Sequence, residues 1–163
     1  TIFLIYLKVM SFVPDIKRLL AYHGAEHKAV NAYEAGVPLD IESVKKFSTA
    51  HPRCGTSFLF IVMVVHILVF SLYGLHGVWL MGLSLVVFIP LIASLSYEFI
   101  YFGARHTQNP VMRALLTPGM LLQSFTTREP DNAQLEIGIL ALQKVVETEQ
   151  AESPLPITPL PAA

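Results

Sequence analysis

Hydrophobic residues dominate one long stretch of the 163-residue chain, residues 54–97, which contains no Lys, Arg, Asp or Glu. A helix needs about 20 apolar residues to cross the hydrocarbon core of a bilayer. The stretch therefore has room for two membrane spans, which we expect at residues 57–73 and 78–97, joined by the short uncharged segment 74–77. Pro90 is expected to kink the second span. The pattern predicts a transmembrane helical hairpin.

Shorter patterns on the N-terminal side predict three helical pieces. Residues 1–13 are interpreted as the trimmed end of a membrane or interfacial helix, so we expect further sequence before them. Pro14 suits the first turn of a helix. This helix is expected to span 14–34, because Gly36 is a typical C-cap residue. A short helix is expected at 40–47.

On the C-terminal side, the second span is expected to continue to His106, after which Asn109 and Pro110 break the helix. The Thr-Pro-Gly segment 117–119 is expected to break the next helix. A last helix opens at Pro130 and carries an apolar stripe that we expect to be a packing face, formed by Leu135, Ile139, Leu142 and Val146. The residues from 153 to the end include four prolines and predict a disordered tail.

Composition and charge favour a membrane protein. The chain is 53% hydrophobic and 14% charged, which is too apolar for a soluble domain of this length. The net charge is −1 and no basic run is present, so a nucleic-acid partner is not expected. Basic residues flank the uncharged stretch on both sides. The positive-inside rule therefore predicts an inner (cytoplasmic) membrane protein with both long flanks in the cytoplasm.

Residue types that commonly bind metal ions occur in two short clusters before the hydrophobic stretch. In the first, His23 and His27 lie about 40° apart on a helix, so they can share one ion. Glu26 lies between them in the order His-x-x-Glu-His, the inverted form of a zinc-peptidase signature. Its carboxylate can act as a general base without being a ligand. The alternative is a solvated helix with two surface histidines.

The second cluster is His51-Pro-Arg-Cys54, which adds an imidazole and a thiol at a spacing common in zinc loops. Cys54 is the single cysteine of the chain, so no disulfide within it can form. It also lies at the expected start of a membrane helix, where the helix dipole favours a thiolate. The alternative is a packing cysteine beside a loop histidine. Together the clusters predict a Zn²⁺ site with four candidate ligands: His23, His27, His51 and Cys54.

Two further carboxylates are candidates for outer contacts or extra ligands. Glu34 lies two turns beyond His27, about 10 Å along the helix axis, so an outer contact or a second metal is favoured over ligation of the same ion. Glu98 is the first charge after the hairpin and returns to the membrane face of His51 and Cys54. A salt bridge to Arg105 is the alternative for Glu98.

Four segments of the chain resemble the YqhQ family, a bacterial multi-pass membrane family of unknown function whose members are described as predicted metal-dependent enzymes. These segments are 23–34, 51–58, Ser-Tyr-Glu at 96–98 and Thr-Arg-Glu-Pro at 127–130. The resemblance extends from about residue 16 to about residue 146. It implies the same kind of membrane protein, the same suspected metal site and additional sequence before residue 1. It implies no substrate.

The expected fold is all-α: a multi-pass membrane protein with a transmembrane helical hairpin and a cytoplasmic helical part that carries the metal site. The expected division is an N-terminal helix end with the His-rich helix and loop (1–56), the hairpin (57–97), cytoplasmic helices (98–150) and the tail (151–163).

Three functions stay open on this evidence. The first is a membrane-embedded zinc hydrolase, such as a peptidase or amidase, with Glu26 as the general base for a metal-activated water. The second is a non-catalytic accessory or assembly subunit of a larger membrane complex, in which four ligands close a structural zinc site. The third is a thiol enzyme with Cys54 as the nucleophile. The lipid bilayer, and in the second case other membrane subunits, are the expected partners.

Overall fold

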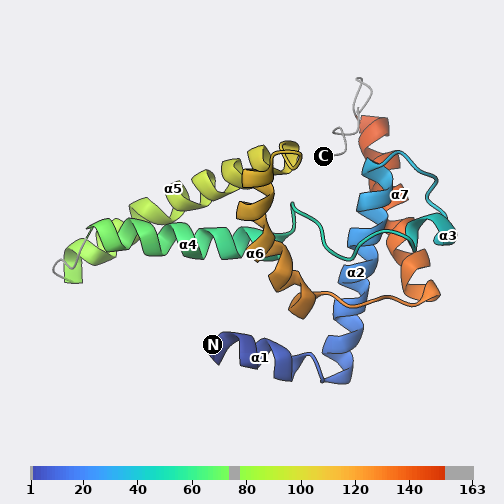
Figure 1. Ribbon diagram of the computed structural model, residues 1–163, viewed down its shortest axis with the longest axis horizontal. Coiled ribbons are helices and arrows are strands. Elements are labelled where there is room, and N and C mark those ends of the chain that lie inside the picture. Colours follow the sequence, from blue (N-terminus) through green and yellow to red (C-terminus); the bar gives the residue numbers. More distant parts are fainter. Residues whose placement is uncertain (1, 74–77, 153–163) are drawn as a thin grey trace. The chain divides into compact units, whose positions relative to one another are not determined.

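The computed structural model describes residues 2–73 and 78–152, and the regular secondary structure within these residues is α-helical (Figure 1). The all-α prediction is confirmed. The described residues form two compact units. We call residues 2–51 together with 122–152 the α2 unit, and residues 52–121, apart from 74–77, the hairpin unit. This grouping differs from the consecutive segments expected, because the C-terminal helix returns to the N-terminal part of the chain.

The central helix of the α2 unit is α2 (Pro14–Glu34), which has the predicted bounds. It follows the short helix α1 (Ile2–Met10). Pro14 occupies the first turn of α2, where the backbone N–H that proline lacks would have no partner within the helix. After its end, Gly36 adopts a φ of +68°, a left-handed conformation that carries no steric penalty for glycine.

The C-terminal helix α7 (Asn132–Glu152) packs along α2. Asp131 and Gln134 cap its first turn reciprocally, because each side chain accepts the other's backbone N–H at 2.9 Å. Gly138 lets the two helices approach closely: a Cβ there would lie 3.2 Å from the Ala25 side chain. The buried core consists of Ala25, Ala29, Ala32, Val44, Leu135 and Ile139. The predicted packing face of α7 is therefore confirmed at Leu135 and Ile139, with Leu142 packed against the core, whereas Val146 is not part of it.

The short helix α3 (Ile41–Val44) is a single turn and does not reach the predicted end at residue 47. Asp40 caps it by accepting the backbone N–H of Ser43 at 2.9 Å. Hydrogen bonds from the backbone and side chain of Ser43 lower the pKa of the Asp40 carboxyl group.

Lys28 binds the segment that follows this helix. Its ammonium group, although only 4% of the residue is exposed, donates to the carbonyl oxygens of Lys45 at 2.9 Å and Phe47 at 2.7 Å. It also forms an ion pair with Glu129 at 2.8 Å. The helix itself ends because the backbone N–H of Phe47 bonds to the carbonyl oxygen of Val44, three residues earlier, and so leaves the α-helical pattern.

Residues 126–129, which connect α6 to α7, lie along α2. The backbone N–H of Arg128 donates to the carbonyl oxygen of Leu20 at 2.9 Å. Gly24 makes this approach feasible, because a Cβ on Gly24 would lie only 2.0 Å from the carbonyl oxygen of Arg128. The absence of a side chain at residue 24 is therefore a requirement of the fold.

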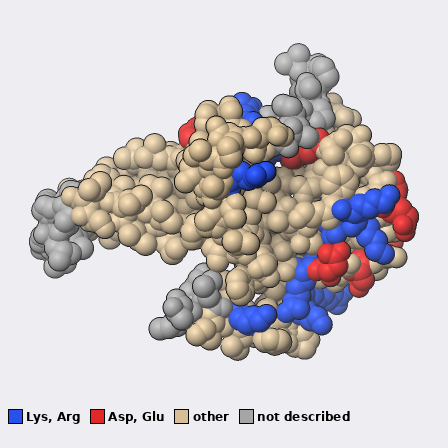
Figure 2. Space-filling model, in the orientation of Figure 1, with Lys and Arg blue, Asp and Glu red and all other residues tan. Residues whose placement is uncertain are grey.

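The hairpin unit contains two long apolar helices, α4 (Gly55–Tyr73) and α5 (Val78–Arg105), which pack along each other. Both are long and apolar enough to cross a membrane. Only 11% and 22% of their most apolar segments are buried inside the molecule. Figure 2 shows a surface without charged groups over the part of the hairpin farthest from α6. The predicted connection 74–77 and the tail residues 153–163 lie outside the described residues.

The next helix, α6 (Pro110–Thr126), begins at the break predicted from Asn109 and Pro110. The prediction that residues 117–119 break this helix is wrong, because α6 continues through Pro118. The physical reason for the glycine is packing: a Cβ on Gly119 would lie 3.1 Å from the hydroxyl oxygen of Ser57 in α4. A Pro-Gly pair therefore marks a close helix contact here, and its sequence does not distinguish that contact from a turn.

We predict that Gly24→Ala destabilises the α2 unit by about 1–3 kcal/mol, because the new methyl group overlaps the Arg128 carbonyl oxygen. The measurement is the thermal unfolding midpoint of the purified protein in detergent, followed by circular dichroism. Gly82→Ala in α5 is the matched control, since a Cβ there meets no atom within 4 Å and alanine favours a helix. Equal midpoints for the two variants would contradict the close contact at Gly24.

Candidate metal centre

Two imidazoles lie side by side on α2. The ring centroids of His23 and His27 are 4.4 Å apart and the ring planes are inclined by 65°. This proximity follows from the helix, because residues four apart lie on the same face. His27 is 5% exposed and His23 is half-buried. The predicted histidine pair is therefore present on a largely enclosed face.

Backbone carbonyl groups orient both rings through the same nitrogen. His23 Nδ1 lies 2.8 Å from the carbonyl oxygen of Thr126, and His27 Nδ1 lies 2.6 Å from that of Thr49. A carbonyl oxygen can only accept, so Nδ1 carries the hydrogen in both rings. In the neutral imidazole this leaves the lone pair on Nε2. Metal-binding histidines are commonly held in this way, by an N–H···O=C bond from the nitrogen that does not bind the ion.

A third imidazole, His51, lies beside His27 with a ring-centroid distance of 5.9 Å. We call His23, His27 and His51 the imidazole cluster. Gln123 fixes the backbone of His51 at both ends: its amide oxygen accepts the His51 N–H, and its amide nitrogen donates to the His51 carbonyl oxygen, each at 2.8 Å. Gln123 is fully buried. Losing it would leave two buried backbone groups without these partners.

The side chain of His51 pairs with Glu34, at the end of α2. Nε2 of His51 lies 3.3 Å from both carboxylate oxygens of Glu34. The carboxylate therefore accepts the Nε2 hydrogen. Glu34, for which an outer contact was expected, therefore contacts His51. Its predicted role beside a metal ion stays a prediction. The Nε2 atom of His51 faces this carboxylate.

The loop that carries Thr49 and His51 is held on α2 by Asn31. Its amide nitrogen donates to the carbonyl oxygens of Ser48 at 2.9 Å and Ala50 at 3.0 Å. Lys28 and Asn31, about one turn apart on α2, thus bind carbonyl groups close in sequence to Thr49, whose own carbonyl group bonds to His27. The loop conformation is set by these side-chain contacts to the main chain.

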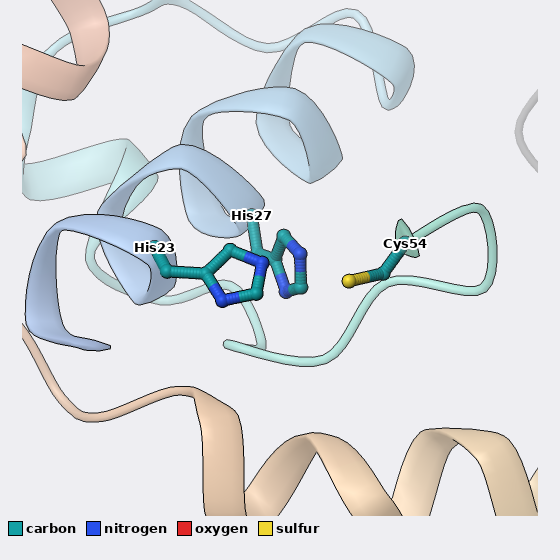
Figure 3. A group of neighbouring side chains, drawn as sticks. All are labelled: His23, His27 and Cys54. Atoms are coloured by element: carbon teal, nitrogen blue, oxygen red, sulfur yellow. The ribbon is translucent and has the colours of Figure 1, made fainter. Parts of the chain in front are cut away.

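Cys54 follows His51 after only two residues, so the chain keeps its Cα within about 11 Å of the His51 Cα. It is 7% exposed, and its Sγ accepts the backbone N–H of Thr56, in the first turn of α4, at 3.4 Å. Figure 3 draws the side chains of His23, His27 and Cys54, three of the four residues that the sequence offers as metal ligands.

The remaining candidates differ in exposure from these residues. Glu26 is exposed on α2, one position before the buried His27. Glu98 is exposed on α5, in the hairpin unit. Neither carboxylate belongs to the group of three in Figure 3, and their predicted roles stay predictions.

Three contributors to the imidazole cluster carry no sequence signal of their own. Thr49 and Thr126 act through backbone carbonyl groups, which every residue has. Gln123 is a single polar residue within an otherwise unremarkable helical segment, and it becomes informative only when its burial is known. In the sequence, Gln123 is marked only by its position four residues before the Thr-Arg-Glu-Pro segment.

Comparison with known proteins gives the chain a family. The model of a family described as "Protein of unknown function (DUF1385)" matches residues 1–148. The "Uncharacterized protein YqhQ" of Bacillus subtilis (strain 168) is 35% identical over 144 residues, which cover 88% of this chain. The chain belongs to the YqhQ family. It spans 45% of the length of that relative, and no solved structure matches it.

Proposed function

We propose that this member of the YqhQ family is a membrane-embedded zinc enzyme, in the first instance a hydrolase of the peptidase or amidase type. The observation that carries the proposal is the common orientation of His23 and His27. Both rings donate from Nδ1 to a backbone carbonyl group and keep Nε2 for an acceptor role. Two oriented imidazoles, together with the thiol of Cys54 three positions after His51 in the chain, match the ligand preference of zinc.

The number of ligands decides between an enzyme and a structural site. A structural zinc has four protein ligands, whereas a catalytic zinc has three and an open position. His51 turns its Nε2 toward Glu34. This favours a set of three ligands, His23, His27 and Cys54, among the four candidates that the sequence offers.

The residues around the cluster can take separate roles in a hydrolysis reaction. Bound zinc would supply a Lewis acid that polarises a carbonyl group and promotes ionisation of water. His51 is positioned to transfer a proton, because its Nε2 lies 3.3 Å from both carboxylate oxygens of Glu34, which orient the ring. Glu26 is the other candidate for a general base, but its carboxylate is exposed. The His51–Glu34 pair is therefore the stronger candidate for proton transfer.

The alternative is an accessory subunit with a structural zinc. The 5.9 Å separation of the His27 and His51 rings favours it, since a small rotation of His51 would bring a fourth ligand to the ion. In that case the zinc would stabilise the fold and no proton-transfer group would be needed.

We predict that Glu34→Gln lowers activity about 10²–10⁴-fold at unchanged zinc content, because an amide offers the His51 ring one acceptor oxygen where the carboxylate offers two. Glu26→Gln is the matched control, with the same chemical change at an exposed position of the same helix, and it should keep activity. The measurement is complementation of the gene-loss phenotype by the full-length protein, together with zinc content after purification.

Other outcomes assign the role differently. Loss of complementation in Glu26→Gln alone would return the general-base role to Glu26. Full complementation by both variants at normal zinc content and expression would contradict the hydrolase and favour the accessory subunit.

We also propose that the hairpin spans the cytoplasmic membrane with both flanks in the cytoplasm, which places the imidazole cluster on the cytoplasmic side. Exposed apolar side chains over α4 and α5 support insertion. Basic residues on both flanks support the orientation. They are Lys8, Lys17, Arg18, Lys28, Lys45, Lys46 and Arg53 before the hairpin, and Arg105, Arg113, Arg128 and Lys144 after it.

This orientation predicts that a cysteine at position 77, in a Cys54→Ser background, reacts with a membrane-impermeant thiol reagent applied to intact cells. A cysteine at position 45 in the same background is the matched control and should react only after the membrane is opened. Labelling of position 45 but not position 77 in intact cells would reverse the orientation.

A further inference from the structure

A small polar cavity lies in the α2 unit, away from the imidazole cluster. Its volume is about 140 Å³, enough for several water molecules. It is lined by Lys8 of α1, by Ser11, and by Ser124, Phe125 and Arg128 from the chain around the end of α6. The lining contains two cationic side chains, two hydroxyl groups and no carboxylate.

Arg128 is anchored at this cavity with hydrogen-bonding capacity left over. Its backbone N–H is bound to the carbonyl oxygen of Leu20. One terminal nitrogen of its guanidinium group donates to the carbonyl oxygen of Ser11 at 2.9 Å and to the Ser11 hydroxyl at 3.2 Å. Its Nε is buried and has no hydrogen-bond partner among the described residues. A buried donor of a charged group without a partner is costly, so an acceptor is expected beside it.

Lys8 is the second cationic residue of the lining. Its side chain is exposed, and its ammonium nitrogen lies 5.6 Å from the centroid of the Phe12 ring. Its backbone carbonyl oxygen accepts the hydroxyl group of Ser11 at 2.7 Å, the residue that Arg128 also contacts. Two cationic residues of the α2 unit thus line one cavity, and the charged end of Lys8 can reorient toward a ligand.

We propose that this cavity binds a phosphate group. A phosphate offers several oxygen acceptors, and a guanidinium group binds them in a planar, directional way while an ammonium group adds a mobile charge. Ser124 also lines the cavity, whereas the hydroxyl hydrogen of Ser11 is donated to the Lys8 carbonyl oxygen. The site is independent of the proposed zinc chemistry, and nothing in that chemistry requires it.

The surroundings favour a phospholipid headgroup as the source of the phosphate. Large apolar side chains of α1 and the turn after it are exposed, namely Ile5, Tyr6, Val9, Phe12 and Val13. An apolar helix beside a basic cavity is the arrangement by which proteins bind the interface of an anionic membrane. The apolar side chains would contact acyl chains while the cavity holds the headgroup.

The test measures binding to the purified full-length protein in dodecyl maltoside by the shift in its thermal unfolding midpoint. One titration adds inorganic phosphate, and a second adds phosphatidylglycerol in mixed micelles. Diacylglycerol with the same acyl chains is the control ligand, because it lacks only the headgroup. A saturable shift with phosphatidylglycerol and none with diacylglycerol is the expected result. Saturation by inorganic phosphate alone would support the cavity but assign it to the free ion.

Variants locate the binding. Lys8→Gln should weaken it about three- to tenfold, because one exposed charge-assisted contact is lost. Lys17→Gln is the matched control: it removes the same charge from an exposed position of α2 that does not line the cavity, and it should leave the affinity unchanged. Arg128→Gln should abolish binding if the variant folds. No saturable shift with either ligand, or equal weakening by Lys8→Gln and Lys17→Gln, would overturn the proposal.

Discussion

The hydrogen bonds from His23 to Thr126 and from His27 to Thr49 are the contacts on which the rest of the α2 unit depends. Each bond joins a ring on α2 to the main chain of a segment distant in sequence. Together they bring the loop before the hairpin and the connection before α7 onto one helix. Because a carbonyl oxygen only accepts, the same bonds select the tautomer in which both Nε2 atoms carry a lone pair. Packing and site chemistry are thus determined by one set of contacts.

These bonds require the main chain to come unusually close to α2. Gly24 permits contact with the carbonyl group of Arg128, and Gly138 permits α7 to lie against Ala25. The buried ammonium group of Lys28 donates to two carbonyl oxygens and forms an ion pair with Glu129. Because α2 has small residues on one face and a buried lysine on the adjacent face, it can bind two irregular segments at once. The sequence around His23 and His27 combines these features within one and a half turns.

Much of this arrangement could be predicted from local sequence. Pro14 and Gly36 mark the ends of α2, and the spacing of His23 and His27 places both rings on one face, because helix geometry depends on near neighbours only. The packing face of α7 followed from its apolar period in the same way. The uncharged stretch likewise predicted two helices of membrane-spanning length.

Other features depend on contacts between distant residues and could not be predicted. Lys28 binds the carbonyl groups that follow the helix at 41–44, and α6 continues past Pro118, where Gly119 packs against Ser57. The pairing of His51 with Glu34 is of the same kind. From sequence alone, His51 was one of four candidate ligands, whereas its contact with a carboxylate distinguishes it from His23 and His27.

X-ray absorption at the zinc edge of the purified full-length protein tests the central claim most directly. Two imidazole nitrogens from His23 and His27, one sulfur from Cys54 and one further light ligand predict a spectrum with a single sulfur neighbour at about 2.3 Å and three light neighbours at about 2.0–2.1 Å, of which two show imidazole scattering. His51→Ala should leave this pattern intact, since His51 is assigned to proton transfer. Loss of one imidazole contribution in His51→Ala, or a purified protein without stoichiometric zinc, would contradict the three-ligand site.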